Sequence, residues 1–188
     1  FVPGTPEGEY YPYWYWYNTQ VLGTLPQEEQ KKLGEILHAN EAAQDSLWYA
    51  NGKKLLSVLA NETDMVVCAE DLGAVPHCVP SVLGELSINS LRVERWARNW
   101  DAPGQPYFEV SEYPRLSVAT TSVHDSSTIL GLWQEDGFDR NFFWKNHMHM
   151  ASEAPQALTP DMVEAVMRNI YKANSLFVIP SMQDYLAL

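Results

Sequence analysis

The chain has 188 residues, 46% of them hydrophobic and 19% charged, and its formal net charge is -12. This length and apolar content suffice for a globular core and do not fit a disordered chain. The acidic balance argues against a nucleic-acid-binding protein, because phosphate contacts need clustered lysine and arginine, and no apolar run reaches the roughly 20 residues of a membrane helix.

The first 17 residues contain an aromatic cluster and no signal-peptide pattern. Since aromatic faces stack on sugar rings, the cluster could form a glucan platform, but we favour packing against a partner domain, to which aromatics contribute large buried areas. The chain does not begin with Met, so we expect its amino terminus to have been trimmed. The cluster comprises Tyr10, Tyr11, Tyr13, Trp14, Tyr15, Trp16 and Tyr17.

Two helices are predicted next. Pro26, followed closely by two glutamates, indicates the start of the first, and Leu33 and Leu37 lie on one face of it. Asp45 would cap the second helix, whose apolar residues continue to Leu59.

From residue 64 the pattern changes to that of a parallel sheet. Residues 65–69 form a continuous apolar run, typical of a strand buried on both faces. Connections of a dozen residues or more between the strands require parallel pairing. Further strands are predicted at about residues 90–93, 116–121 and 176–180. The helices between and around them are expected to begin at Pro76, at Ser126 or Ser127, and at Pro160.

This alternation predicts an α/β fold. An open doubly wound sheet is one option, but the chain has no glycine-rich phosphate loop of the GxGxxG or GxxxxGK[ST] type. The C-terminal half of a (β/α)8 TIM barrel with helical insertions fits better, because polar groups follow the carboxyl ends of two strands, where barrel active sites lie. A whole barrel takes about 250 residues, so we expect an insertion or linker at residues 1–45 and half a barrel at residues 46–188.

Two strand ends carry candidate functional groups. Glu70 follows the first apolar run directly and could serve as a general acid; alternatively, Glu70 or Asp71 caps the next helix or forms an ion pair. His124 and Asp125 follow the strand at 116–121. They could contact a sugar hydroxyl and a developing positive charge, or be a core histidine and a helix cap, and the local pattern leaves both interpretations open.

Three motifs follow one another along the chain: CAEDLG at residues 68–73, SVHDSST at residues 122–128 and PSMQDYL at residues 180–186. They resemble, in order, segments of the 4-α-glucanotransferases of glycoside hydrolase family 77, the amylomaltases or disproportionating enzymes. The resemblance extends over about residues 47–188 and is strongest to the branch that includes the plant cytosolic disproportionating enzyme. It therefore implies a cytoplasmic location.

The resemblance also implies roles for single residues. Glu70 would be the general acid/base, Asp125 the transition-state stabiliser and His124 a ligand of the sugar in the donor subsite. The implied reaction transfers α-1,4-glucan segments between malto-oligosaccharides, with retention through a covalent glucosyl-enzyme intermediate. No metal and no organic cofactor is implied, and the expected partners are α-1,4-glucans, not nucleic acid or a membrane.

The sequence departs from the family in two places. The family's nucleophile is an aspartate in an Arg-x-Asp-His motif, which does not occur here, so we expect it upstream of Phe1 and expect the chain to be a fragment that is inactive alone. An exposed half-barrel edge would favour self-association. The stretch at residues 92–97 follows the family only loosely: Arg92, Arg95 or Trp96 could reach glucan, or Arg92 could pair with a strand-end carboxylate.

Two other functions stay open, a non-catalytic glucan-binding barrel and an α-amylase-like hydrolase. Ser126, where the family commonly has asparagine, supports the first, and the three-carboxylate plan shared by related barrels supports the second.

His147 and His149 have a spacing that could bind zinc but no cysteine nearby. Cys68 within a buried strand would be inert, and with two cysteines we expect thiols of a reduced compartment.

Overall fold

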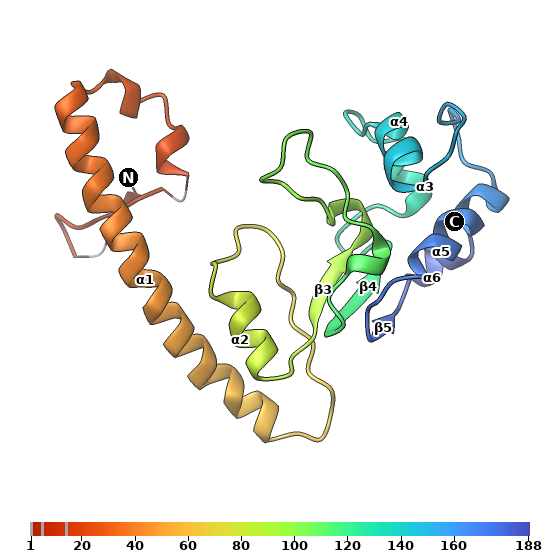
Figure 1. The fold of residues 1–188 in the computed structure, drawn as a ribbon, viewed down its shortest axis with the longest axis horizontal. Helices are drawn as coiled ribbons and strands as arrows, with labels where there is room; N and C mark the ends of the chain where they lie inside the picture. The colour runs from red at the N-terminus through yellow and green to blue at the C-terminus, as the bar shows by residue number, and fades with distance from the viewer. Residues whose placement is uncertain (1, 5, 14) are drawn as a thin grey trace. The chain divides into compact units, whose positions relative to one another are not determined.

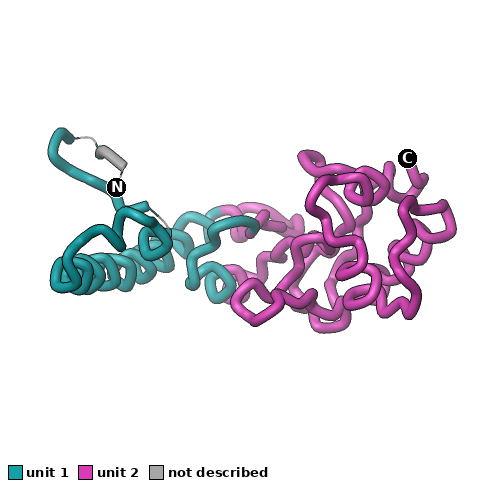
Figure 2. The backbone as a smooth tube through the Cα atoms, turned by 90° about the horizontal axis from the view of Figure 1, so that it is seen from above, with its two compact units in different colours: residues 1–58, 72–82 teal, residues 59–71, 83–188 magenta. Residues whose placement is uncertain are grey.

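The computed structural model describes residues 2–4, 6–13 and 15–188, so Trp14 of the aromatic cluster lies outside the described residues. The chain divides into two compact units (Figure 2), one made of residues 1–58 and 72–82 and the other of residues 59–71 and 83–188. No helix in the described part of the chain combines the length and the apolar character needed to cross a membrane.

Helix α1 (Gln27–Asn61) is the longest element of the first unit and runs without a break (Figure 1). It begins after Pro26, as predicted, with Glu28 and Glu29 in its first turn. The prediction of two separate helices is wrong. Asp45 caps no helix of its own, because its carboxylate accepts a hydrogen bond from the backbone N–H of Cys78 at 3.2 Å, and no proline interrupts the helix around it.

The segment before α1 is built from short elements: strands β1 (Val2–Pro3) and β2 (Tyr10–Tyr11), which pair antiparallel, and 3-10 helices η1 (Trp16–Asn18) and η2 (Leu22–Thr24). The tyrosines of the aromatic cluster are exposed, from 44% for Tyr15 to 64% for Tyr10. Trp16 instead packs edge-on against His38 of α1, with ring centroids 5.0 Å apart. The tyrosine faces are thus open within the first unit.

Three parallel strands form the sheet of the second unit, in the order β3 (Ser90–Val93), β4 (Ser117–Thr120) and β5 (Phe177–Val178). Figure 1 shows them side by side. All three were predicted: β3 at its observed bounds, and β4 and β5 with ends that differ by one to two residues. Their spatial order follows their order in the sequence, as it does in a (β/α)8 barrel. The α/β class is confirmed, while half a barrel stays a prediction.

The expected strand at residues 65–69 is reduced to one parallel bridge, between Cys68 and Asn89. The Ala69 N–H donates to the Asn89 carbonyl at 2.8 Å, which adds this segment to the free edge of β3. The prediction that the run is buried on both faces is wrong here, since Met65 is 78% exposed and Val66 56%. Burial of a strand requires covering elements on each face, which an apolar run does not itself specify.

The second unit also contains several helices, while α2 (Val79–Glu85) is divided between the units, with residues 79–82 in the first and 83–85 in the second. Helix α5 begins at Pro160, as predicted, and Thr159 caps it by accepting the N–H of Met162 at 3.4 Å. The helix predicted from Pro76 begins three residues later, at Val79. The remaining bounds are α2 (Val79–Glu85), η3 (Glu94–Trp96), η4 (Val110–Glu112), α3 (Ile129–Leu132), α4 (Arg140–Phe142), π-helix η5 (Phe143–His147), α5 (Pro160–Ile170) and α6 (Met182–Tyr185).

Two buried clusters hold this unit together. One packs Ala119 of β4 against Ile170 of α5, with neither side chain exposed, and includes Tyr113. The other joins α3, η5 and α5 through the aromatic rings of Trp133, Phe143 and Trp144. Together they fix β4, and the loop that leaves it, against the helices that follow.

Candidate functional site

Glu70 lies one residue beyond the bridged segment, at the carboxyl end of this edge of the sheet. Its side chain is exposed, and within the described residues it makes no hydrogen bond or ion pair. Gly73 ends the segment with a φ of 80°, a left-handed conformation that side chains disfavour. The left-handed turn thus comes three residues after Glu70, and Asp71 between them still bonds to β3.

Asp71 makes the structural contacts that Glu70 does not. One carboxylate oxygen of Asp71 accepts the backbone N–H of Leu91 at 2.7 Å, and the other pairs with Arg92 at 3.2 Å. The predicted ion pair between Arg92 and a strand-end carboxylate is confirmed. Because Asp71 fills that role, the structural interpretation applies to Asp71 and not to Glu70.

His124 and Asp125 lie in the loop that links β4 to α3, residues 121–128, which we call the β4 loop. Both are exposed and, among the described residues, have no hydrogen-bond or ion-pair partner. His124 is therefore not a core histidine. Nor does Asp125 cap α3, since that role falls to Thr128, whose hydroxyl accepts the N–H of Gly131 at 3.2 Å.

The serines predicted to cap α3 stabilise the β4 loop itself. Ser126 accepts the backbone N–H of Val123 at 3.0 Å, which closes a turn around His124 and Asp125. Gly131 gives the loop room, because a Cβ atom there would lie 2.9 Å from the Cβ of Ser127. The prediction of Ser126 or Ser127 as the cap is wrong by one or two residues, because the Ser126 hydroxyl bonds within the loop and the Ser127 hydroxyl bonds to Arg95 and Glu135.

A residue without a predicted role lies behind the β4 loop. Asp184 of α6 is 1% exposed, and its carboxylate accepts hydrogen bonds from the hydroxyls of Thr121 and Ser122 and from the backbone N–H of Ile129. The Thr121 and Ile129 contacts are both 2.6 Å long. One feature of the sequence pointed to Asp184: it belongs to the motif at residues 180–186, which resembles a segment of the family.

Arg95 of η3 holds the other side of the β4 loop. Its guanidinium donates to the Ser127 hydroxyl at 2.8 Å and to the backbone carbonyls of Ser127 and Thr128. Burial lowers the pKa of Arg95, and the nearby Glu135 and Asp184 carboxylates oppose that shift. A guanidinium stays charged at neutral pH in any protein, so two buried charges of opposite sign flank the loop.

Glu94 and the two histidines of the predicted zinc pattern form separate contacts. Glu94 and His147 are buried and lie 2.8 Å apart, whereas exposed His149 lies 3.0 Å from Glu109. The two histidines therefore face different carboxylates. Trp96, two residues after Glu94, is 39% exposed.

Both cysteines are free thiols. Cys68 is exposed, so the expectation of a thiol inside a buried strand is wrong for it. Cys78 is buried, and burial together with the neighbouring Asp45 carboxylate raises the pKa of its thiol, which keeps it protonated and unreactive at neutral pH.

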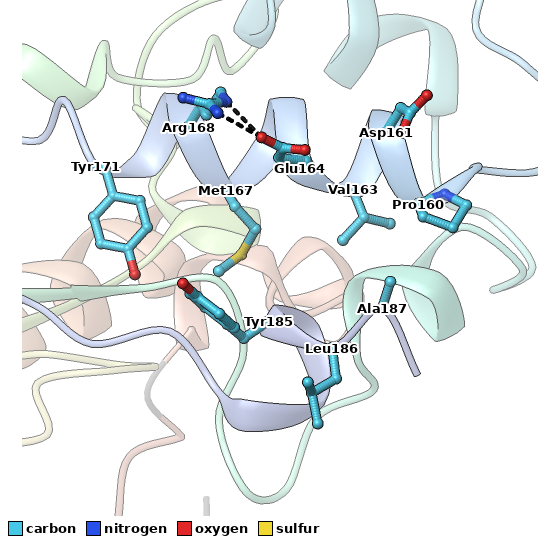
Figure 3. Close-up of a pocket in the computed structure, with 10 residues that line it drawn as sticks. All are labelled: Pro160, Asp161, Val163, Glu164, Met167, Arg168, Tyr171, Tyr185, Leu186 and Ala187. Carbon is cyan, nitrogen blue, oxygen red and sulfur yellow. Dashed lines mark hydrogen bonds and ion pairs between the residues drawn. The ribbon is translucent and has the colours of Figure 1, made fainter.

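Two cavities among the described residues lie away from the candidate carboxylates. A cavity of about 490 Å³ separates α5 from α6 (Figure 3), with the rings of Tyr171 and Tyr185 at one end and Pro160 at the other. A second cavity, of about 700 Å³, lies within the first unit and is lined by Tyr17, Trp48, His38 and Asp45, among others. Neither is lined by Glu70, His124 or Asp125.

Residues 11–188 match a family model described as 4-alpha-glucanotransferase. The 4-alpha-glucanotransferase DPE2 of Oryza sativa subsp. japonica is 37% identical over 150 residues, which are 78% of this chain and 15% of that protein. The 4-alpha-glucanotransferase of Chlamydia trachomatis is 31% identical over 141 residues, covering 75% of this chain and 26% of that protein. The chain thus spans about a quarter, or less, of the length of these relatives.

Among solved structures, an amylomaltase from Streptococcus agalactiae in complex with acarbose is similar in fold. The match has a TM-score of 0.51 at 20% identity and covers 66% of this chain and 24% of that one. At this identity the likeness concerns the fold alone.

Proposed function

The chain belongs to the 4-alpha-glucanotransferase family, and from that membership we propose that it carries two of the active-site carboxylates for transfer of α-1,4-glucan segments. Glu70 is the general acid/base, Asp125 stabilises the transition state and His124 binds the donor sugar. The proposed substrates are α-1,4-glucans and malto-oligosaccharides, as the names of the related 4-alpha-glucanotransferases suggest.

One observation supports the proposal above all: Glu70, His124 and Asp125 are exposed and unpartnered in the described structure, while their neighbours Asp71 and Ser126 are used structurally. A carboxylate that the fold holds at a strand end without giving it a partner is available to a ligand. The same edge of a parallel sheet is where barrel enzymes place their substrate.

The arrangement suits distinct roles for the two carboxylates. Strand β3 lies between the segment of Glu70 and β4, and adjacent strands are about 4.8 Å apart, so the two strand ends are roughly 10 Å apart. A retaining enzyme needs its attacking carboxylate about 5–5.5 Å from the acid/base. Asp125 follows a strand that is not the immediate neighbour of the Glu70 segment, and we assign it the role of stabiliser of the oxocarbenium-like state, as the family resemblance implies.

The proposed reaction has two steps. In the first, an attacking carboxylate from outside these 188 residues bonds to the anomeric carbon, while Glu70 gives its proton to the glycosidic oxygen of the leaving glucan. In the second, Glu70 takes the proton of the acceptor hydroxyl, whose oxygen displaces the carboxylate and restores the original configuration. Asp125 carries no proton in either step and acts through its charge.

This mechanism goes together with a proposed architecture. Residues 46–188 would form the second half of a (β/α)8 barrel, and residues 1–45 an insertion or linker. The 188-residue chain alone, incubated with maltotriose, should then form no oligosaccharide longer than maltotriose.

The test is the Glu70→Gln variant of the gene product that carries this chain, assayed for conversion of maltotriose into longer and shorter oligosaccharides. Loss of a general acid/base should lower the rate by about 10²–10⁴-fold. Glu62→Gln, an exposed glutamate in the same unit, is the matched control and should keep the full rate. Equal rates for the two variants would refute the role of Glu70.

The alternatives separate by products and binding. An α-amylase-like hydrolase would release new reducing ends, whereas transfer conserves their number. A non-catalytic glucan-binding protein is favoured by a separate observation, the exposed tyrosines before α1, and it would bind amylose while leaving maltotriose unchanged.

A further inference from the structure

Asp184 has the contacts of a group that fixes the β4 loop. A buried carboxylate is costly unless hydrogen bonds replace its water, and this one accepts three, all from residues at the two ends of the loop. The donors Thr121 and Ser122 precede His124 and Asp125, and the donor Ile129 follows them. A single side chain therefore sets the separation of the loop's ends.

The contacts of Asp184 are directed by its own helix. Its backbone N–H donates to the Ser181 hydroxyl at 3.2 Å, the cap of α6, and that hydroxyl lies 3.0 Å from the Ser122 hydroxyl. The start of α6 is thereby joined to the β4 loop through two side chains. Asp184 and Ser122 are buried, at 1% and 5% exposure, and Ser181 is half-buried, so the carboxylate itself is out of reach of an oligosaccharide.

We propose that Asp184 is a positioning residue of the active site: it holds the β4 loop in the shape that presents Asp125 to the substrate, without itself touching the substrate. This inference rests on the proposed function of Asp125. It gives α6 a part in the reaction. The rate should depend on the placement of Asp125, because a displacement of about 1 Å at a reacting centre can cost about 100-fold in rate.

The first test is kinetic, in the gene product that carries this chain. Asp184→Asn keeps the side-chain volume but replaces one of the two accepting oxygens by an NH2 donor, so either the Ile129 N–H or the pair of Thr121 and Ser122 hydroxyls loses its acceptor. We expect kcat for maltotriose transfer to fall about 100-fold, with KM changed by no more than about twofold. Asp136→Asn, on the exposed turn after α3, is the control and should leave both constants unchanged.

A double variant distinguishes positioning from an independent structural role. If Asp184 acts through Asp125, then adding Asp184→Asn to Asp125→Asn should lower the residual rate by less than about threefold. If the two losses multiply, Asp184 does not act through Asp125, and the inference is overturned. Thr121→Val and Ser122→Ala each remove one donor and provide milder versions of the same test should Asp184→Asn fail to fold.

The second test does not depend on catalysis. Hydrogen exchange of the amides in residues 121–129 should become faster in Asp184→Asn, while that of β3 and of α5 stays as in the parent protein. Unchanged exchange in the loop would overturn the inference, whatever the kinetics. If instead the loop loosens but Asp125→Asn retains full transfer activity, the proposed function of Asp125 fails and the positioning role at the active site fails with it.

Discussion

The segment after Ala69 and the β4 loop both carry candidate carboxylates, but their supports differ. The first is held by Asp71, which reaches one backbone N–H and pairs with Arg92, itself 27% exposed. The second is held from both sides by the buried charges of Asp184 and Arg95. Since a charged hydrogen bond is worth more when water cannot replace it, the β4 loop should be the more firmly fixed of the two.

This contrast fits the two proposed roles. A residue that stabilises a developing charge is effective when it is in place before the charge appears. An acid/base must serve two oxygen atoms in turn, that of the leaving glucan and that of the acceptor. We therefore expect some freedom around Glu70 and little around Asp125. Substitutions at Asp184, Arg95 and Asp71 test this difference, and one at Tyr113 tests the core beneath β4.

The largest effect is expected for Asp184→Ala. It leaves the Ile129 N–H and two hydroxyls without their acceptor in a buried site, so the free energy of unfolding of the chain should fall by about 3–5 kcal/mol. Urea unfolding monitored by tryptophan fluorescence measures it. Asp136→Ala, an exposed control, should change the value by about 0.5 kcal/mol or less, and a similar loss in both variants would remove the contrast.

Arg95→Lys should cost about 2 kcal/mol in the free energy of unfolding. A single ammonium group cannot reach the Ser127 hydroxyl and two carbonyls together, as the guanidinium does. The matched control is Arg168→Lys, because Arg168 pairs with Glu164 on the exposed face of α5 and should lose about 0.5 kcal/mol or less. If both exchanges cost the same, Arg95 does not hold the loop.

Asp71→Asn should cost about 1 kcal/mol or less. The amide oxygen can still accept the Leu91 N–H, and only the ion pair with partly exposed Arg92 is lost. Arg92→Gln should have a similar effect, and the double variant should be less destabilised than the sum of the two. A loss as large as that of Asp184→Ala would show that the two supports are equally strong.

The smallest effect on the free energy of unfolding at neutral pH is expected for Tyr113→Phe. This variant tests whether the core beneath β4 excludes water from the Tyr113 hydroxyl. The Tyr113 hydroxyl is buried, with no partner among the described residues, so its removal should change the free energy of unfolding by about 0.5 kcal/mol or less at pH 7.

At alkaline pH the same variant should differ clearly from the parent. Burial raises the pKa of Tyr113 in the folded chain above its usual value of about 10. The unfolded chain therefore loses this proton first, and stability falls as pH rises above about 10. Tyr113→Phe should flatten that decline in urea unfolding between pH 9 and 11, whereas exposed Tyr185→Phe should not.

Features that depend on neighbours in the sequence could be predicted. The strand at Phe177–Val178 and the helix that begins at Pro160 follow from short-range patterns, an apolar run and a capped start with proline. Glu70, His124 and Asp125 could be singled out because each follows a predicted strand. That Asp71, one residue further, takes the ion pair depends on where Arg92 lies, which no local pattern specifies.

The features that prediction missed depend on distant contacts. Asp45 was expected to cap its own helix, and it bonds instead to a backbone N–H 33 residues away. The exposure of Met65 depends on what covers a strand, and Asp184 reaches donors more than 50 residues earlier. Local sequence records the ability of a carboxylate to accept hydrogen bonds, but not which donors will approach it.

The reach of Asp184 also has a consequence for the order in which the chain folds. Its three donors precede it by 55 to 63 residues, so the β4 loop emerges during synthesis well before the carboxylate that fixes it. At about 5–20 residues per second, that delay lasts roughly 3 to 13 seconds. Strands β3 and β4 can pair in the meantime, whereas the loop that carries Asp125 acquires its final shape only after α6 has docked.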